Sequence, residues 1–303
     1  MRLHRELSRE IERPLALAIG FFDGLHLGHR ELMRETLRAR KPGWRSGVLT
    51  FSNHPAAFLR PGTQPLLLTT VQERIDRFAE AGIEECFFVP FDERIASMTP
   101  QGFLDMLVTQ LGVRAVAVGE TFRFGRKRAG DVAFMRSYLA SHRVAVTAVP
   151  SINLDGERVS STRIRALVYD GDLERAEAML GYGYELRGIV EVGAGRGHGL
   201  GFPTANIHPP EKLLPRDGVY SGVARYDGRD YATLVSIGTN PQFGENVRSI
   251  EAWLRDFRKS IYGRELALRE LRFVREQAIF ASIDELVAQM QRDLEAVAYP
   301  GFS

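Results

Sequence analysis

Cysteine is nearly missing from this 303-residue chain, which contains only Cys86. A single cysteine cannot form an internal disulfide, so the sequence excludes a disulfide-stabilised secreted scaffold and suits a reducing cytoplasm. Cys86 opens the apolar run CFFV at 86–89. Such a run is typical of a buried strand, and we therefore expect Cys86 to be a buried structural residue.

Long apolar runs and a strong excess of one charge are also missing. No segment approaches the ~18 apolar residues of a membrane span. Residues 1–14 alternate in charge and lack the apolar core of a signal peptide. The net charge of +2 is nearly balanced, so nothing requires a nucleic-acid partner. We expect a cytoplasmic protein with neither a membrane nor a nucleic-acid partner.

Apolar residues are present in an ordinary share. They make up 44% of the chain, which is enough for a large core, and the length suggests two domains. In the first half, strand-like and helix-like segments alternate, which predicts a doubly wound α/β fold with a parallel sheet. The strand-like segments are 15–22, 47–52, 85–90, 114–119 and 144–149, and the helix-like segments lie near 29–40, 71–81, 100–111 and 130–141.

The pattern changes near Tyr184 to short strands and turns. Segments 218–224 and 231–237 are strand-like, and an Asp-Gly hairpin signal joins them. Because closure removes exposed strand edges, a compact antiparallel β-barrel is the economical arrangement. The chain ends in an amphipathic helix that opens on a capping box at 282–285.

A glycine-rich turn at 20–29, with the sequence GFFDGLHLGH, closes an apolar strand and opens a helix. The glycines remove side chains where a ligand must approach backbone N–H groups, and a helix start favours phosphate. His26 and His29 lie three apart, where two imidazoles can grip the phosphates of a nucleotide. The candidate binding residues of this turn are Gly20, Asp23, Gly24 and Gly28, and the candidate catalytic residues are His26 and His29.

The histidine pair has two other interpretations, a zinc site and an ordinary turn. Zinc is disfavoured, because the spacing is not that of a metalloprotease helix and no cysteine or third histidine lies nearby in the sequence. An ordinary turn with incidental histidines stays open on the residues alone.

Three further segments would meet at the carboxyl edge of the sheet, where ligands bind in doubly wound folds. Two are the loops 52–55 (SNHP) and 119–125 (GETFRFG). The third, 158–165 (RVSSTRIR), offers hydroxyl and guanidinium donors to a triphosphate. A helix N-cap with surface arginines is the other interpretation of that segment. Its candidate nucleotide-binding residues are Arg158, Ser161, Thr162 and Arg165.

A second glycine-rich loop lies at 193–206, with the sequence GAGRGHGLGFPTAN. It lacks the Gly-Lys-Ser/Thr of a P-loop. Thr204 and Asn206 are two apart and so share one face of an extended segment, where a hydroxyl and an amide oxygen suit a hard cation. We expect both to be magnesium ligands, with water and ATP phosphates completing the shell. The candidate phosphate-binding residues are Gly195, Gly197, Gly201 and Thr204.

These motifs resemble those of known families. The turn at 20–29 resembles the G-x-F-D-G-x-H-x-G-H signature of the nucleotidylyltransferase superfamily, and S-S-T-x-I-R at 160–165 resembles the version in bacterial FAD synthetases. G-F-P-T-A-N at 201–206 resembles the P-T-A-N motif of riboflavin kinases, and 217–220, 237–241 and 261–263 continue the match. Over nearly its whole length the chain resembles a bifunctional riboflavin kinase/FMN adenylyltransferase of the bacterial type.

The resemblance implies a Rossmann-like nucleotidyltransferase domain with a parallel sheet at 1–182 and an antiparallel β-barrel riboflavin kinase domain with a terminal helix at 183–303. It implies that riboflavin and ATP give FMN and ADP, and that FMN and ATP then give FAD and pyrophosphate. The ligands would be riboflavin, FMN, FAD and ATP, with Mg²⁺ accompanying ATP. Asn206 and Glu251 would be catalytic residues of the kinase, with Glu251 as the base toward the riboflavin 5′-hydroxyl. On position alone, Glu251 fits a solvent-facing strand residue.

The chain departs from the family patterns at three places. Phe21 stands where asparagine is common, Thr121 where an acidic or amide residue is usual, and the basic stretch 255–260 where an acidic run is usual. Two alternatives therefore stay open: a riboflavin kinase with a weakened adenylyltransferase module, and a non-catalytic flavin- or nucleotide-binding regulator. The candidate catalytic residues argue against a regulator, because binding alone needs neither a positioned γ-phosphate nor a base.

Overall fold

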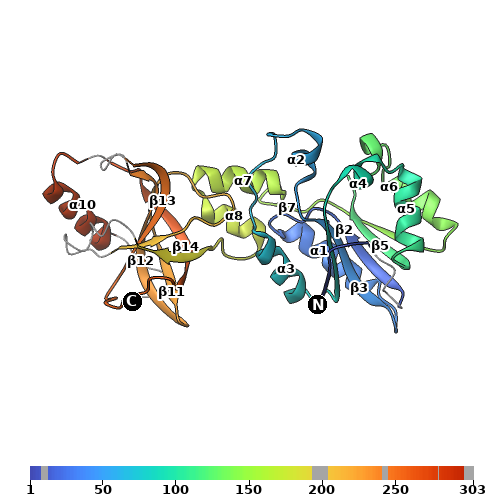
Figure 1. Ribbon diagram of the computed structural model, residues 1–303, viewed down its shortest axis with the longest axis horizontal. Coiled ribbons are helices and arrows are strands. Elements are labelled where there is room, and N and C mark those ends of the chain that lie inside the picture. Colours follow the sequence, from blue (N-terminus) through green and yellow to red (C-terminus); the bar gives the residue numbers. More distant parts are fainter. Residues whose placement is uncertain (8–12, 193–203, 241–244, 279, 297–303) are drawn as a thin grey trace. The chain divides into compact units, whose positions relative to one another are not determined.

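The computed structural model describes residues 1–7, 13–192, 204–240, 245–278 and 280–296. The contacts within the chain divide it into two compact units, Met1–Ser161 and Thr162–Ser303 (Figure 1). The helical residues between 162 and 182 are therefore grouped with the second unit. The domain boundary at 182/183, which rests on the sequence motifs, stays a prediction.

The first unit is built on a six-stranded sheet in the order β1-β4-β3-β2-β5-β6. All of its pairings are parallel, which confirms the predicted doubly wound fold. The chain runs outward from β2 to β4 and then crosses back to β5, so the strand order reverses between β2 and β5. The strands are β1 (Arg2–His4), β2 (Leu15–Ile19), β3 (Arg45–Phe51), β4 (Glu85–Val89), β5 (Val113–Gly119) and β6 (Ala145–Val149).

Helices cover both faces of this sheet. Successive strand residues point to opposite faces, so the inner strands pack against both layers of helices. Ala18 and Phe88 pack with α1 and α3, whereas Ile19 and Val89 pack with α4, α5 and α6. Cys86 is buried on the α1 side, as the sequence predicted. The helical elements are α1 (Leu27–Arg38), α2 (Pro55–Leu59), α3 (Val71–Glu80), α4 (Glu93–Ser97), α5 (Pro100–Thr109), η1 (Arg126–Arg128) and α6 (Val132–Ala140), and the short strands β7 (Asn153–Leu154) and β8 (Glu157–Arg158) follow β6.

The edge strand β1 lies in a charged segment that gave no strand signal. His4 Nε2 contacts Glu85 Oε2 at 2.7 Å, and the His4 ring stacks on Phe87 with 4.7 Å between ring centroids. Glu85 is buried and also accepts a hydrogen bond from Arg45 Nη1 at 2.9 Å. Cross-strand polar contacts therefore fix β1 on β4, and a search for apolar periodicity cannot detect such a strand.

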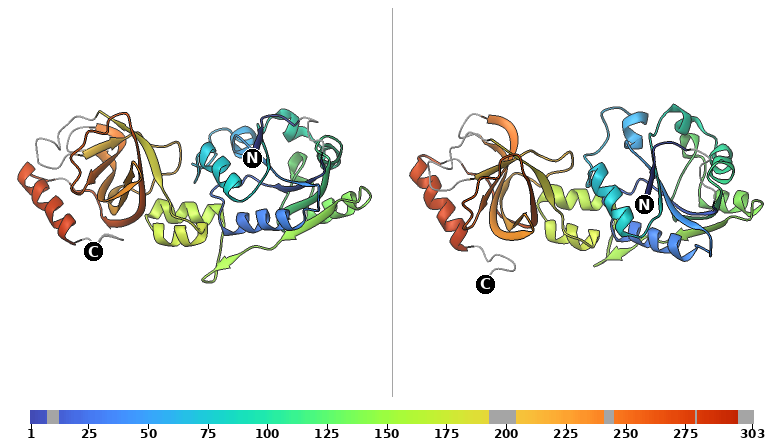
Figure 2. Two further views of the ribbon diagram at one scale, coloured as in Figure 1. Left: turned by 90° about the horizontal axis from the view of Figure 1, so that it is seen from below. Right: turned by 60° about the horizontal axis from the view of Figure 1, so that its bottom comes forward.

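The second unit contains a closed barrel in the order β10-β13-β12-β11-β14-β9, drawn from yellow to dark orange in Figure 2. Its neighbours are antiparallel, which confirms the predicted barrel. At the predicted hairpin, Asp227 has a φ of 49° and Gly228 a φ of 74°, as a type I′ turn requires. The strands are β9 (Leu186–Glu191), β10 (Thr204–Ile207), β11 (Gly218–Tyr226), β12 (Arg229–Asn240), β13 (Glu245–Leu254) and β14 (Glu265–Arg275).

Helices α7 (Ser161–Asp170) and α8 (Leu173–Leu180) precede the barrel, and α10 (Ile283–Ala296) follows it. The carboxylate of Glu177 on α8 accepts hydrogen bonds from the Tyr184 N–H and from Arg272 Nη1 of β14, both at 2.9 Å. On α10, Asp293 contacts the guanidinium of Arg275 at the end of β14 at 2.7 to 3.0 Å. A half-buried carboxylate on α8 and a buried one on α10 therefore attach both helices to the same barrel strand.

Candidate functional site

The turn after β2 follows a path that its glycines make possible. Gly20 donates its N–H to the Leu49 carbonyl oxygen at 3.2 Å, and a Cβ on Gly20 would lie 2.9 Å from the ring of Phe22. Phe22 is buried with a φ of 59°, and Gly24 has a φ of 78°. Positive φ at a bulky residue is strained, so the surrounding packing must hold this turn in place. The turn leads into α1, and the start of a helix presents unpaired backbone N–H groups.

The carboxylate of Asp23 holds the turn from within. It accepts hydrogen bonds from the backbone N–H groups of Leu68 and Thr69 at 2.9 to 3.2 Å and from the Thr69 hydroxyl at 3.0 Å. The Gly24 N–H in turn donates to Thr69 Oγ1 at 3.1 Å. Asp23 is buried, so these donors compensate a charge that would otherwise be costly. In this structure the carboxylate ties the turn to the segment before α3, and its role toward a nucleotide stays a prediction.

The two histidines form a stacked pair at the start of α1. His26 is the N-cap, and its Nδ1 accepts a hydrogen bond from the His29 N–H at 3.4 Å. Because Nδ1 is the acceptor, the proton of the neutral ring lies on Nε2, which is then a donor. The two rings stack with 3.7 Å between their centroids. Burial and then the nearby His26 hold the pKa of His29 well below its ordinary value, so His29 is neutral at pH 7.

Two of the predicted loops contact residues of the predicted nucleotide-binding motifs. His54, which caps α2, meets the ring of Phe21 edge-on with 4.7 Å between centroids, so the loop after β3 lies beside the turn after β2. Thr121 Oγ1, in the loop after β5, accepts a hydrogen bond from Arg158 Nη2 at 3.5 Å. Arg158 is exposed and ends the short strand β8. Thr121 stands where an acidic or amide residue is usual, and in this chain its hydroxyl is a hydrogen-bond partner of Arg158.

Ser161 connects the two motifs of the predicted nucleotide site. Its Oγ donates to the carbonyl oxygen of Asp23 at 2.9 Å, although 138 positions separate the two residues in the sequence. The structure therefore brings Ser161 against the turn at 20–29. Thr162 and Arg165 follow on the first turns of α7, in the second compact unit, where Thr162 is exposed and Arg165 is half-buried.

In the barrel, Thr204 and Asn206 share one face of β10, as predicted. Both are half-buried, whereas the alternating Ala205 and Ile207 are buried. Asn206 lies directly opposite Glu251 of β13. Directly opposite residues of an antiparallel pair point to the same face, with Cβ atoms about 4.5–5.5 Å apart. The backbone register therefore assembles the amide of Asn206 and the carboxylate of Glu251 from segments far apart in the sequence.

The oxygen atoms on this face suit the binding of a hard cation, and the carboxylate among them can also accept a proton. Ser236 of β12 lies opposite Glu251 on the other side, which extends the row of oxygen-bearing side chains. Within the described part of the chain, no group of three or more His, Cys, Asp or Glu side chains could hold a metal ion. A cation at Thr204 and Asn206 would accordingly rely on oxygens from substrate and water, which is typical of magnesium. Gly195, Gly197 and Gly201 lie outside the described residues.

No pattern in the sequence indicates Arg74, which contacts the turn after β2. Arg74 belongs to α3 and is buried, and its Nη1 donates to the carbonyl oxygens of Phe21 and Phe51 at 3.3 and 3.2 Å. Arginine in an amphipathic helix is normally a solvent-facing residue. The local pattern therefore contains no signal for its position, which follows only from the placement of α3.

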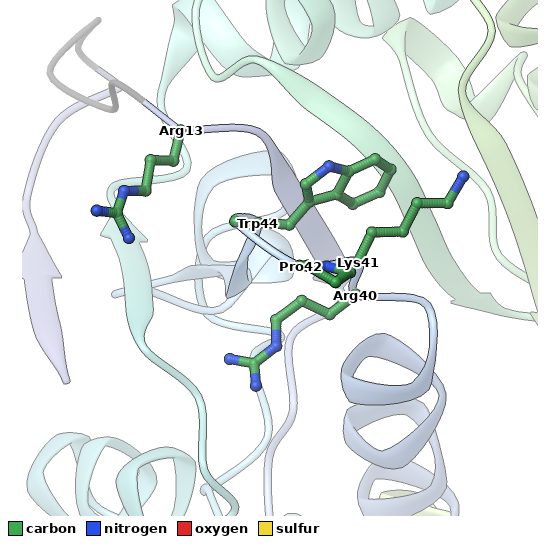
Figure 3. Close-up of a pocket in the computed structure, with 6 residues that line it drawn as sticks. Arg13, Arg40, Lys41, Pro42 and Trp44 are labelled. Atoms are coloured by element: carbon green, nitrogen blue, oxygen red, sulfur yellow. The ribbon is translucent and has the colours of Figure 1, made fainter.

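A shallow basic groove of about 420 Å³ lies at the other end of the sheet, where β2 and β3 begin (Figure 3). The side chains of Arg13 and Arg40 point to one side of it, and Lys41 extends to the other, past Trp44. Arg40 also pairs with Glu84 at 2.6 Å. The groove is at the amino ends of the strands and is separate from the site at their carboxyl ends.

Comparisons with known proteins agree on both halves of the chain. The family model for FAD synthetase matches residues 8–163, and the model for riboflavin kinase matches residues 180–299. A protein of Listeria monocytogenes is 34% identical over 91% of this chain and 89% of its own length, and one of Escherichia coli K12 is 33% identical over 95% and 93%. Both are named bifunctional riboflavin kinase/FMN adenylyltransferase.

A solved structure shares the fold. It is described as a macrolide-efflux protein from Streptococcus pneumoniae, is 28% identical, and covers 99% of both chains with a TM-score of 0.87. Among the residues that the model places, no helix has the length and apolar character needed to cross a membrane.

Proposed function

Because this chain belongs to the family of bifunctional riboflavin kinases/FMN adenylyltransferases, we propose that it converts riboflavin to FMN and then FMN to FAD, using ATP in both steps. The observation that carries the proposal is that each unit keeps its own assembled set of polar groups. Ser161 contacts the turn at Asp23 in the first unit, and Asn206 lies opposite Glu251 in the second.

The adenylyl transfer belongs to the first unit. An oxygen of the FMN phosphate attacks the α-phosphorus of ATP, the bond to the β-phosphate breaks, and pyrophosphate leaves, so no protein nucleophile is needed. The start of α1 and the Nε2–H of His26 supply donors to the phosphate oxygens. His29 adds a second polar ring that carries no positive charge at pH 7. Arg158 and Ser161 bind the remaining phosphate oxygens, and Gly20, Asp23, Gly24 and Gly28 form the turn that receives them. Thr162 and Arg165 follow Ser161 in the sequence motif and stay predicted phosphate-binding residues.

The kinase step belongs to the barrel. The riboflavin 5′-hydroxyl oxygen attacks the γ-phosphorus of ATP, the bond to the β-phosphate oxygen breaks, and ADP leaves. The carboxylate of Glu251 accepts the hydroxyl proton. Thr204 and Asn206 would hold Mg²⁺, which would supply positive charge to the phosphate oxygens. Gly195, Gly197 and Gly201, which lie outside the described residues, stay the predicted phosphate-binding glycines of this step.

The ligands of this chain are then riboflavin, FMN, FAD and ATP, and it acts in the cytoplasm without a membrane or a nucleic-acid partner. The near-balanced charge supports the absence of a nucleic-acid partner. The single buried cysteine is consistent with a reducing compartment.

One assay tests the proposal against both alternatives. Purified protein is incubated with riboflavin, ATP and Mg²⁺, and the flavins are separated by chromatography. FMN and FAD together support the bifunctional enzyme, and FMN alone supports a kinase with a weakened second module. Unchanged riboflavin, with no FAD from added FMN, supports a non-catalytic binding protein and contradicts the proposal.

A further inference from the structure

Arg74 is a buried cation that the mechanism above does not use. It is the fourth residue of α3 and has no exposed surface. Its guanidinium lies against two aromatic rings, 4.8 Å from the centroid of Phe21 and 5.0 Å from that of Phe88. Nη1 donates to the carbonyl oxygens of Phe21 and Phe51. Since Phe51 ends β3 and Phe21 lies just beyond β2, one side chain ties together the ends of two neighbouring strands.

Arg74 and Asp23 make two connections between the turn and the region of α3, one from a side chain on α3 and one from a side chain in the turn. Asp23 reaches from the turn to the N–H groups of Leu68 and Thr69, just before α3, and Arg74 reaches from α3 back to the Phe21 carbonyl. A capping box between Thr70 and Glu73 fixes the start of α3 between these two contacts. The turn is therefore held on both sides of Phe22, whose positive φ needs such support.

Stability alone does not account for an arginine here. Burial lowers the pKa of Arg74, with the charges of Asp23 and Cys86 acting in the opposite direction. Nε and Nη2 of Arg74 have no hydrogen-bond partner among the residues that the structure describes. Buried donors without partners are destabilising, and exchanging a buried charge for an apolar side chain of similar size is often neutral or stabilising. A residue that is costly to bury and still contacts the site turn has a role beyond packing.

We propose that Arg74 is a positioning residue for adenylyl transfer. It fixes the carbonyl of Phe21 and so holds the strained turn that aims Gly24, His26 and the start of α1 at the phosphates. Thr50 supports the same atom, because its Oγ1 donates to the Phe21 carbonyl at 2.9 Å. Arg74 itself is fully buried and does not touch the nucleotide. This inference rests on the proposed function of the first unit.

The test compares both reactions in one preparation of the full chain. Arg74→Met replaces the cation with an apolar side chain of similar length. We expect FAD formation from added FMN to fall by about 10²-fold in kcat, since small misplacements at a reacting site have effects of that size. FMN formation from riboflavin should stay at the wild-type level, and any fall in the midpoint of thermal unfolding should leave the enzyme folded at the assay temperature. Arg38→Met, which removes an exposed ion pair with Glu35 at the end of α1, is the matched control and should change neither activity.

Two further variants distinguish a positioning role of Arg74 from a packing role. Arg74→Lys keeps a charged donor but not the planar group that lies against two rings, so it should recover part of the lost kcat. Thr50→Val removes the other donor to the Phe21 carbonyl with little change of shape. It should lower FAD formation in the same direction, and the double variant should show a non-additive loss.

The outcomes are distinct. Wild-type protein that forms no FAD from added FMN contradicts the proposed function itself. An active wild type with an equally active Arg74→Met variant overturns the positioning role, as does a loss of kcat that merely follows a lowered unfolding midpoint and a loss of FMN formation. If Arg74→Met fails to fold, Thr50→Val decides, and wild-type adenylyl transfer in that variant overturns the proposal.

Discussion

At the scale of single residues, the two proposed phosphate sites differ in their polar groups. The first depends on a stacked pair of imidazoles at a helix start, and the second on an amide and a carboxylate that lie opposite each other on two strands. Because neither set lies in the other unit, lesions in the two sets should block different steps.

His29→Ala should stop the pathway at FMN. Removing one polar contact to a developing charge typically lowers turnover by about 10²–10³-fold. Riboflavin should therefore become FMN at nearly the wild-type rate, and little FAD should follow. Chromatography of the flavins over time measures both products, and a variant that makes FAD normally would contradict the role of His29.

Asn206→Ala should produce the reverse pattern, because it removes an oxygen expected to hold the cation beside Glu251. Little FMN should form from riboflavin, whereas FMN supplied from outside should be adenylylated normally. The assignment of the two chemistries would be wrong if Asn206→Ala abolished FAD formation from added FMN while His29→Ala left it intact.

His29 should also make stability depend on pH. Its pKa in the folded protein lies well below the value of about 6.5 expected for the unfolded chain. The unfolded chain then binds a proton more readily, so this contribution is fully present above about pH 6.5 and is lost as the pH falls toward the folded pKa. The unfolding midpoint of the wild type should fall faster between pH 7 and 5 than that of His29→Asn, by differential scanning fluorimetry. A constant difference between the two proteins would rule this out.

At the scale of elements, the sequence predicted what depends on local pattern. The buried strands of the sheet, the Asp-Gly hairpin and the start of α10 follow from apolar runs, turn chemistry and capping. At α10 the Glu285 N–H donates to Ser282 Oγ at 3.2 Å, which confirms the expected cap. The Glu285 carboxylate, however, accepts from the Ala281 N–H rather than from the cap residue.

The contacts that sequence analysis missed are long-range and polar. His4 finds Glu85 and Arg74 finds the Phe21 carbonyl only after distant elements have packed. The partners of Asp23 are also distant in the sequence. Asp23 was expected to bind a ligand, but its carboxylate accepts hydrogen bonds from the backbone N–H groups of Leu68 and Thr69. Motifs therefore indicate candidate site residues, but not the distant residues that contact and support them.

The helix α8 should matter for the kinase barrel, although it precedes the predicted boundary at 182/183. Glu177 on α8 accepts from Tyr184 and Arg272, and the helix buries Leu173 and Met179. A fragment that starts at residue 162 should therefore fold and make FMN. One that starts at Gly181 loses these contacts and should unfold at a lower temperature. Thermal unfolding and an FMN assay of both fragments measure this, and equal midpoints would show that α8 adds nothing.

At the scale of the whole molecule, the turn at 20–29 belongs to one compact unit and the Asn206–Glu251 pair to the other, so FMN made by one copy should be usable by another. A mixture of His29→Ala and Asn206→Ala proteins should convert riboflavin to FAD, although neither variant does so alone. Chromatography of the mixture against each variant by itself gives the readout. No FAD from the mixture, with both variants active in their remaining step, would mean that FMN must stay with the chain that made it.

The short strand β1 has a further consequence for the whole molecule. The barrel is closed and offers no free strand, whereas β4, with its run CFFV, would form the border of the parallel sheet if β1 were absent. An unpaired apolar border is a template for adding strands from other chains, which leads to aggregates. A three-residue strand anchored by His4 on Glu85 covers that border. Loss of the first seven residues should therefore leave the chemistry of both sites in place and instead reduce the amount of enzyme that stays in solution.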